Sequence, residues 1–141
     1  MTPGTQDDGG IRLSDGQCAF TFTRPRPGVL LLRIEGTDRG RLGTAPIDHV
    51  REEIGRFGLL DLFIDARSAG VASMEVSDAW TAFFHANAGG LRRVSILAVS
   101  QFVHLTVSVA KLFSRTGELI QIYSDAALFE AALAAAARAR S

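Results

Sequence analysis

The sequence is short of cysteine, of lysine and of long apolar runs. Cys18 is its single cysteine, so an internal disulfide is excluded and a reducing compartment, the cytoplasm, is expected. Lys111 is its single lysine, and 15 basic side chains balance 15 acidic ones, so no surface that follows nucleic acid phosphates is expected. No apolar run reaches the ~18 residues that a membrane span needs. The sequence therefore predicts a cytoplasmic chain with no nucleic acid partner and no membrane span.

The short motifs of common catalytic and cofactor sites are also lacking. The sequence contains neither a Gly-x-Ser-x-Gly nucleophile elbow nor a glycine-rich phosphate loop. His49, His85 and His104 fall on three different predicted helices, without a second ligand at metal-binding spacing. Asp61 and Asp65 would stand ~13 Å apart on one strand, too far for a catalytic carboxylate pair. We expect no enzyme activity, no metal and no cofactor.

The first sixteen residues differ in composition from the rest of the chain. They are rich in Gly, Asp, Thr and Ser, and only Ile11 and Leu13 have much to bury. Such a segment cannot offset its chain entropy by burial, so residues 1–16 are predicted to be a disordered leader. Residues 17–141 are expected to form a single domain, which at this length needs no disulfide or metal.

Strand and helix patterns alternate through that domain. Apolar periodicity predicts strands over residues 18–23, 29–35, 59–65, 92–99 and 119–123. Helices are predicted over residues 45–57, from a cap at Ser73 to Gly89, over residues 101–116, and from residue 126 onward. Because helical crossovers join parallel strands, the order predicts an α/β fold with a five-stranded, mostly parallel sheet and an antiparallel first hairpin.

The polar pattern of the strands predicts how the helices cover this sheet. One side of the strands repeatedly carries charged or amide side chains, so we expect the helices mainly on the other face. Trp80 is expected to be buried in the contact of its helix with that face. On the partly solvated face, an apolar strip is formed by Leu31, Phe63, Leu97 and Tyr123. Exposed strips of this kind mark interaction sites, so the strip predicts a homodimer contact unless the leader or the first hairpin covers it.

Three segments carry a resemblance to a known family. They are Ile-Asp-Ala-Arg at residues 64–67, Arg-Arg-Val at residues 92–94, and Tyr-Ser-Asp-Ala-Ala at residues 123–127. With the element order, they resemble the SpoIIAA-like family of bacterial STAS/Sec14-type domains. The resemblance implies a non-enzymatic regulatory module of the anti-sigma-factor-antagonist type, whose protein partner would be an anti-sigma factor or a kinase. It also implies a switch by serine phosphorylation in some members, and a lipid or other small apolar ligand in others.

The end of the central strand is the predicted site. The strand is expected to deliver Asp65 to a surface loop, at the edge where parallel sheets place their binding sites. The predicted partner-binding residues are Asp65, Arg67, Ser68, Val71, Ser73, Met74 and Glu75. The resemblance makes Ser73 the first phosphorylation candidate and Ser68 the second, while a structural helix cap is the alternative role for Ser73. Two functions stay open: a protein-binding regulator, which we prefer, and a carrier or sensor of an apolar ligand.

Overall fold

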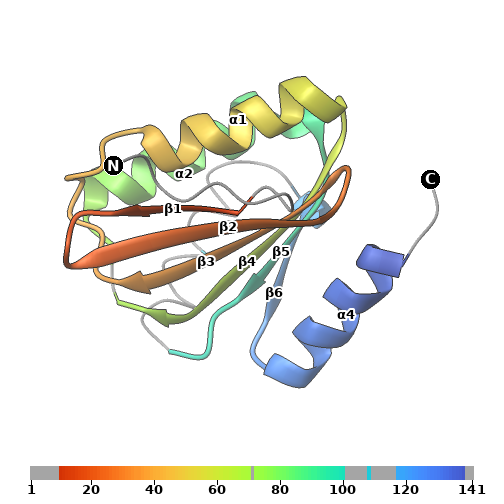
Figure 1. Cartoon of the computed structure of the whole chain (residues 1–141). Coiled ribbons are helices and arrows are strands. Elements are labelled where there is room, and N and C mark those ends of the chain that lie inside the picture. The colour runs from red at the N-terminus through yellow and green to blue at the C-terminus, as the bar shows by residue number, and fades with distance from the viewer. Residues whose placement is uncertain (1–9, 71, 101–107, 109–116, 139–141) are drawn as a thin grey trace.

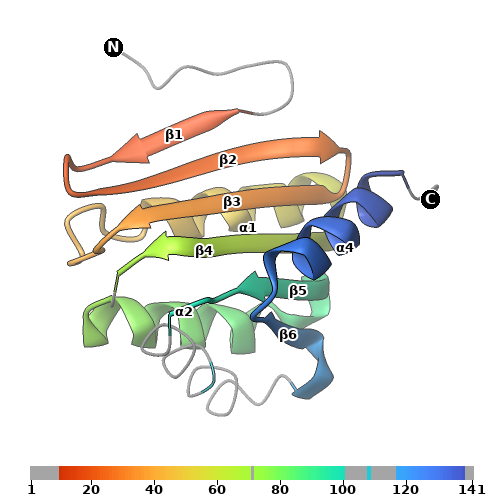
Figure 2. The ribbon, with the colours of Figure 1, turned by 90° about the horizontal axis from the view of Figure 1, so that it is seen from below.

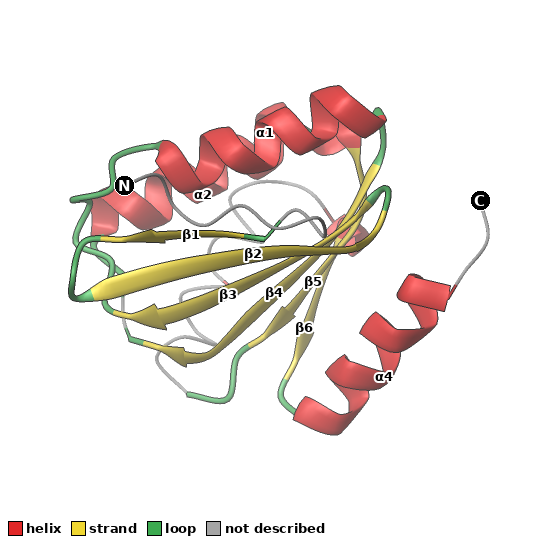
Figure 3. Cartoon of the chain, in the orientation of Figure 1, coloured by secondary structure: helices red, strands yellow, loops and turns green. Residues whose placement is uncertain are grey.

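A computed structural model describes residues 10–70, 72–100, 108 and 117–138 of the chain (Figures 1 and 3). Its strands are β1 (Ile11–Ser14), β2 (Cys18–Arg26), β3 (Val29–Gly36), β4 (Leu60–Ala69), β5 (Leu91–Leu97) and β6 (Ile120–Tyr123). Its helices are α1 (Ala45–Phe57), α2 (Met74–Ala86) and α4 (Ala126–Arg138), with short 3-10 turns at Ala88–Gly90 and Gly117–Leu119. The strands form one sheet in the order β1-β2-β3-β4-β5-β6. The first three are antiparallel and the pairs from β3 to β6 are parallel, which confirms the predicted α/β class.

The predicted number of strands was wrong by one. β1 lies inside the segment predicted to be a disordered leader, where it pairs with β2 and places Ile11 opposite Phe22 and Leu13 opposite Phe20. Ile11 and Leu13 pack against the main core, so pairing and burial together order a segment that its composition alone would leave unfolded. Residues 1–9 of the predicted leader, and the helix predicted over residues 101–116 except Ser108, lie outside the described residues.

The main core lies between the sheet and the helices α1 and α2, which cover the same face (Figure 1). The bounds of α1 agree with the predicted helix: Pro46 stands in its first turn, and Gly58 ends it with a positive φ of 80°. This core is lined by apolar side chains of both helices and of the strands beneath them, among them Leu30, Leu32, Ile47, Val50, Leu62, Ile64, Phe83 and Val94. Among the described helices, none is long and apolar enough to cross a bilayer.

Trp80 is less buried than predicted. It is partly exposed beside the main core, and its ring centroid lies 5.8 Å from those of Phe83 and Phe84. Phe83 and Phe84, one turn further along α2, are the buried aromatic residues of the helix. The predicted contact of this helix with the sheet is present, but Phe83 and Phe84 are buried in it in place of Trp80.

The opposite face of the sheet is covered by α4, which crosses it from the end of β6 towards the start of β3 (Figure 2). Phe129 of this helix is 1% exposed and packs with Leu31, Phe63 and Leu97, which are buried, and with Tyr123, which is partly buried. The prediction that these four side chains form an exposed dimer contact was therefore wrong. α4 of the same chain covers the strip. The buried ring of Phe129 removes the apolar side chains of the strip from water without a second copy of the protein.

Candidate functional site

Asp65 lies in β4 itself and not in a loop after it, since the strand continues to Ala69. Its side chain is turned to the face that α4 covers, and the residue is only 5% exposed. Burial of a carboxylate is costly unless charged or hydrogen-bonding partners surround it. The charge of Asp65 therefore requires compensation by neighbouring groups.

Arg67 supplies most of that compensation. Its backbone N–H donates to Asp65 Oδ1 at 3.1 Å, and its Nε donates to Oδ1 at 3.0 Å and to Oδ2 at 3.1 Å. Arg33, on the neighbouring strand β3, adds a longer ion pair, with Nε 3.7 Å from Asp65 Oδ2. The Asp65 carboxylate is thus held between two guanidinium groups, one hydrogen-bonded and one more distant.

A bulge in the pairing of β3 with β4 brings the next side chains to the same place. Arg33 pairs with Asp65 but Glu35 pairs with Ser68, so β4 contains one extra residue between these pairs. Such a bulge re-aims the side chains that follow it. As a result, Arg67 and Ser68, although adjacent in sequence, both line one surface depression.

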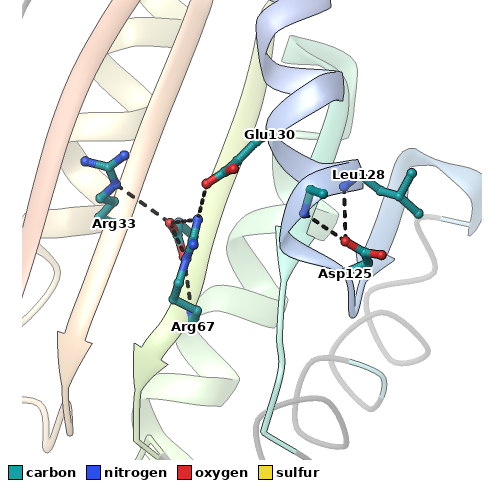
Figure 4. Close-up of polar contacts among 7 residues, drawn as sticks. Arg33, Arg67, Asp125, Leu128 and Glu130 are labelled. Atoms are coloured by element: carbon teal, nitrogen blue, oxygen red, sulfur yellow. Dashed lines mark hydrogen bonds and ion pairs between the residues drawn. The ribbon is translucent and has the colours of Figure 1, made fainter.

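This depression has a volume of about 290 Å³ and is open to solvent. Its lining is mostly charged and comes from β3, β4 and α4: Arg33, Ile34, Glu35, Asp65, Arg67, Ser68 and Glu130. Glu130, from α4, closes one side by accepting a hydrogen bond from Arg67 Nη2 at 3.0 Å (Figure 4). The hydrogen bonds to Asp65 and Glu130 raise the pKa of the Arg67 guanidinium, so it is charged at any physiological pH.

The start of α2 forms a second, separate part of the predicted site. Ser73 caps this helix, as the sequence predicted: its Oγ accepts a hydrogen bond from the Val76 N–H at 3.3 Å. Its own N–H donates to the carbonyl of Asp38 at 3.1 Å, which fixes the entry of the chain into the helix. The next residue, Met74, is 79% exposed, and Glu75 is exposed beside it.

The structure therefore divides the predicted partner-binding residues into two groups. Asp65, Arg67 and Ser68 line the depression on the face that carries α4. The others, Ser73, Met74 and Glu75, lie at the start of α2, which packs on the opposite face, and they do not line the depression. Val71 lies outside the described residues. Whether Ser68 or Ser73 is phosphorylated stays a prediction.

Four residues of the depression were absent from the predicted site: Arg33, Ile34, Glu35 and Glu130. Glu130 was not considered, because nothing in the alanine-rich sequence of α4 indicates the face on which the helix lies. Arg33 belongs to the charged side chains on the polar side of the strands and was not assigned to the site. Its position beside Asp65 follows from the parallel register of β3 and β4, and the charged residues at corresponding ends of those strands were the signal available in the sequence.

Comparison with known proteins supports a statement about the fold. No family model and no curated protein matches the sequence. A crystal structure of an uncharacterized protein of the DUF3478 family from Shewanella loihica PV-4, which has a SpoIIAA-like fold, superposes with a TM-score of 0.61 at 13% sequence identity. The match covers 86% of this chain and 98% of that one. The resemblance found in the sequence is thus confirmed at the level of the fold: the chain has a SpoIIAA-like fold.

Proposed function

We propose that the protein is a non-enzymatic regulatory module that binds a protein partner through the first turn of α2. The observation that carries this proposal is Met74, the most exposed of the large apolar side chains that the structure describes. Methionine is flexible and polarizable, and it is common on surfaces that bind other proteins. Protein interfaces contain several contact residues, so the residues near Met74 bear on the proposal as well.

The same edge of the sheet offers further contact residues on a rigid base. Val99, just after β5, is 52% exposed, and it follows a strand that is parallel to β4 and adjacent to it. Ser73 and Glu75 flank Met74 with polar groups. An apolar centre with a polar rim is typical of a protein interface. The cap at Ser73 fixes the backbone at the start of α2, so the position from which the Met74 side chain projects is set before binding.

Phosphorylation of Ser73 is the proposed switch of this contact. A phosphate there would add about −1.5 to −2 charges at a helix N-terminus, where the helix dipole favours negative charge. The added charge would lie next to Met74 and would act on the partner more than on the fold. An anti-sigma factor or a kinase is the kind of partner that the fold resemblance suggests.

The depression supports a protein contact better than an apolar ligand. A carrier of lipid or of another apolar molecule needs an enclosed cavity with mostly apolar walls. The depression described here is open, and five of its seven lining residues, Arg33, Glu35, Asp65, Arg67 and Glu130, are charged. Such a surface suits the charged side chains of another protein.

Site-specific photo-crosslinking tests the proposed contact. A photoreactive phenylalanine analogue placed at Met74 is compared with the same residue at Glu52, an exposed position on α1. In the cells that naturally produce the protein, we expect one crosslinked protein from position 74 and none from position 52. No crosslink from position 74, or the same crosslinks from both positions, would overturn the proposal.

A further inference from the structure

Arg33 is the arginine of the depression whose hydrogen-bonding capacity is unused. Its side chain is 58% exposed, and its contact with Asp65, at 3.7 Å, is an ion pair and not a hydrogen bond. Among the described residues, no hydrogen bond from the Arg33 guanidinium is found. Arg67, in contrast, bonds to both Asp65 and Glu130, and Arg12 donates to Thr21 Oγ1 at 3.2 Å. A guanidinium group has five N–H donors, arranged to bind two oxygens of one anion at once.

Ser68 adds a second unused donor beside it. Its side chain is exposed, it lines the same depression, and its hydroxyl makes no hydrogen bond to the described residues. The bulge that places Ser68 opposite Glu35 is what turns it towards the depression. Arg33 on β3 and Ser68 on β4 therefore both place free hydrogen-bond donors at the depression.

The depression is lined by three carboxylates and two guanidinium groups. The carboxylates are Glu35, Asp65 and Glu130 and the guanidinium groups are Arg33 and Arg67, while Arg12, outside the lining, pairs with Glu35 at 3.7 Å. Asp65 is buried and closely held, but Glu130 is exposed, with 58% of its side chain accessible. An exposed ion pair is worth at most about 1 kcal/mol, so an incoming anion can replace Glu130 on Arg67 at small cost.

We propose that the depression binds an anionic group, a carboxylate or a phosphate monoester, through Arg33 and Ser68, with Arg67 exchanging Glu130 for the anion. In the bound state the anion lies between two guanidinium groups, while Asp65 beneath keeps its bonds to the backbone N–H and Nε of Arg67. Because the lining carries one more carboxylate than guanidinium before binding, the affinity is modest, with a Kd on the order of millimolar for a small free anion. This site is separate from the contact proposed at Met74.

A titration of the free protein with inorganic phosphate tests the site. The backbone amide signals of Arg67 and Ser68 are followed by NMR while sodium phosphate replaces sodium chloride at constant ionic strength and pH. We expect saturable shifts at these two amides. Shifts that do not saturate, or shifts spread evenly over the chain, would overturn the proposal.

Three variants identify the groups involved, each at an exposed side chain whose loss the fold should tolerate. Arg33→Ala should weaken phosphate binding roughly tenfold through the loss of the bidentate donor. Glu130→Gln should strengthen it severalfold, since the competing carboxylate is gone and Arg67 is released. Arg51→Ala removes an exposed arginine of α1 on the opposite face and should leave binding unchanged. Equal losses in Arg33→Ala and Arg51→Ala would show attraction by net charge alone and would overturn the assignment. No gain in Glu130→Gln would overturn the exchange at Arg67.

A competition experiment distinguishes a free anion from an anionic side chain of a partner. The crosslinking is repeated in a lysate of the same cells, and the yield from position 74 is measured with and without phosphate at the concentration that saturates the NMR shifts. A lower yield with phosphate assigns the site to a carboxylate or phosphate carried by the partner, and an unchanged yield assigns it to a free anion. Because the titration itself needs no partner, failure of the Met74 contact and failure of the anion site would be seen separately.

Discussion

Phe129 of α4 meets Phe63 of β4 edge to face, with ring centroids 5.8 Å apart and ring planes at 76°. Phe129 also contacts Tyr123 of β6, with centroids 5.9 Å apart. It is the one side chain of α4 that is fully buried, while most of its neighbours in the helix are alanines. The attachment of α4 to the sheet thus depends largely on a single aromatic residue.

Removing that ring should destabilise the protein strongly. We expect Phe129→Ala to lower the free energy of unfolding by about 3–5 kcal/mol, from lost burial and the cavity left behind. Leu128→Ala is the matched control, because the adjacent side chain is 61% exposed, and it should cost less than about 1 kcal/mol. Urea denaturation of both variants measures the difference. Similar losses for the two would show that α4 is not held by Phe129.

The contacts of Arg67 with Asp65 and with Glu130 should contribute differently to the stability of the protein. Arg67→Met leaves the buried carboxylate of Asp65 with the backbone N–H of residue 67 and the more distant charge of Arg33, so we expect a loss of about 2–3 kcal/mol in unfolding free energy. Glu130→Gln removes only the exposed partner of Arg67 and should cost at most about 1 kcal/mol. Thermal and urea unfolding at pH 7 compare the variants. A greater loss in Glu130→Gln would contradict the central role given to Asp65.

His49 should make the fold sensitive to acid. Its ring lies 4.4 Å from that of Phe22, and its Nε2 is buried without a hydrogen-bond partner among the described residues. Burial lowers the pKa of His49 below 6.5, with a smaller contribution from Arg24, while Glu53 and Glu52 oppose the shift. The unfolded chain therefore takes up this proton at a higher pH than the folded chain. The stabilisation by neutral His49 is complete above pH 6.5 and is lost as pH falls through the lower folded pKa.

The variant His49→Leu isolates this effect. Leucine keeps an apolar side chain against Phe22 but cannot be protonated. The stability of the parent minus that of the variant should decrease between pH 7.5 and pH 5, as measured by urea unfolding across the range. A constant difference would mean that His49 has the same pKa in the folded and unfolded chains.

Gly36 should be the glycine least tolerant of substitution among those with positive φ. Its φ is 80°, and an added Cβ would stand only 2.0 Å from the backbone oxygen of Gln17. Gly16 is a matched control, because its φ is 93° but nothing lies within 4 Å of an added Cβ. We expect Gly16→Ala to cost about 1–2 kcal/mol from backbone conformation alone. Gly36→Ala should cost a further 1–3 kcal/mol or so from the clash, measurable by thermal unfolding.

The sequence predicted the elements that depend on local periodicity. The bounds of α1 agree with the prediction, and Ser73 caps α2 as expected. β1 was missed because Ile11 and Leu13 are too few to give a pattern, and because its order comes from pairing with β2. The position of α4 was missed for a related reason: a run of alanines has high helix propensity but does not show which face of the sheet the helix covers. In the structure Phe129 is buried on that face, and Leu133 and three alanines of α4 pack beside it.

The location of the candidate site was predicted from the sequence, but the arrangement of its side chains was not. The end of β4 and the start of α2 do carry the polar side chains that the sequence indicated. What the sequence could not show is the bulge after Asp65, because it is defined only by the register with β3. That one extra residue turns Arg67 and Ser68 to the face of α4, while Met74 follows on the other side of the sheet. Contacts between strands, not the local pattern, thus divide the site in two.

The strand order of the sheet is also the order of the strands in the chain. Each described strand therefore pairs with strands that are its neighbours in the chain. The parallel pairs still require a crossover each, from Gly36 to Leu60 and from Ala69 to Leu91, and the loop entropy of that closure must be overcome before the strands can pair. On a ribosome, the antiparallel strands β1, β2 and β3 can pair first, and β4 and β5 can join the growing edge after α1 and α2 emerge. α4, the last helix described, then docks on a face that is already complete.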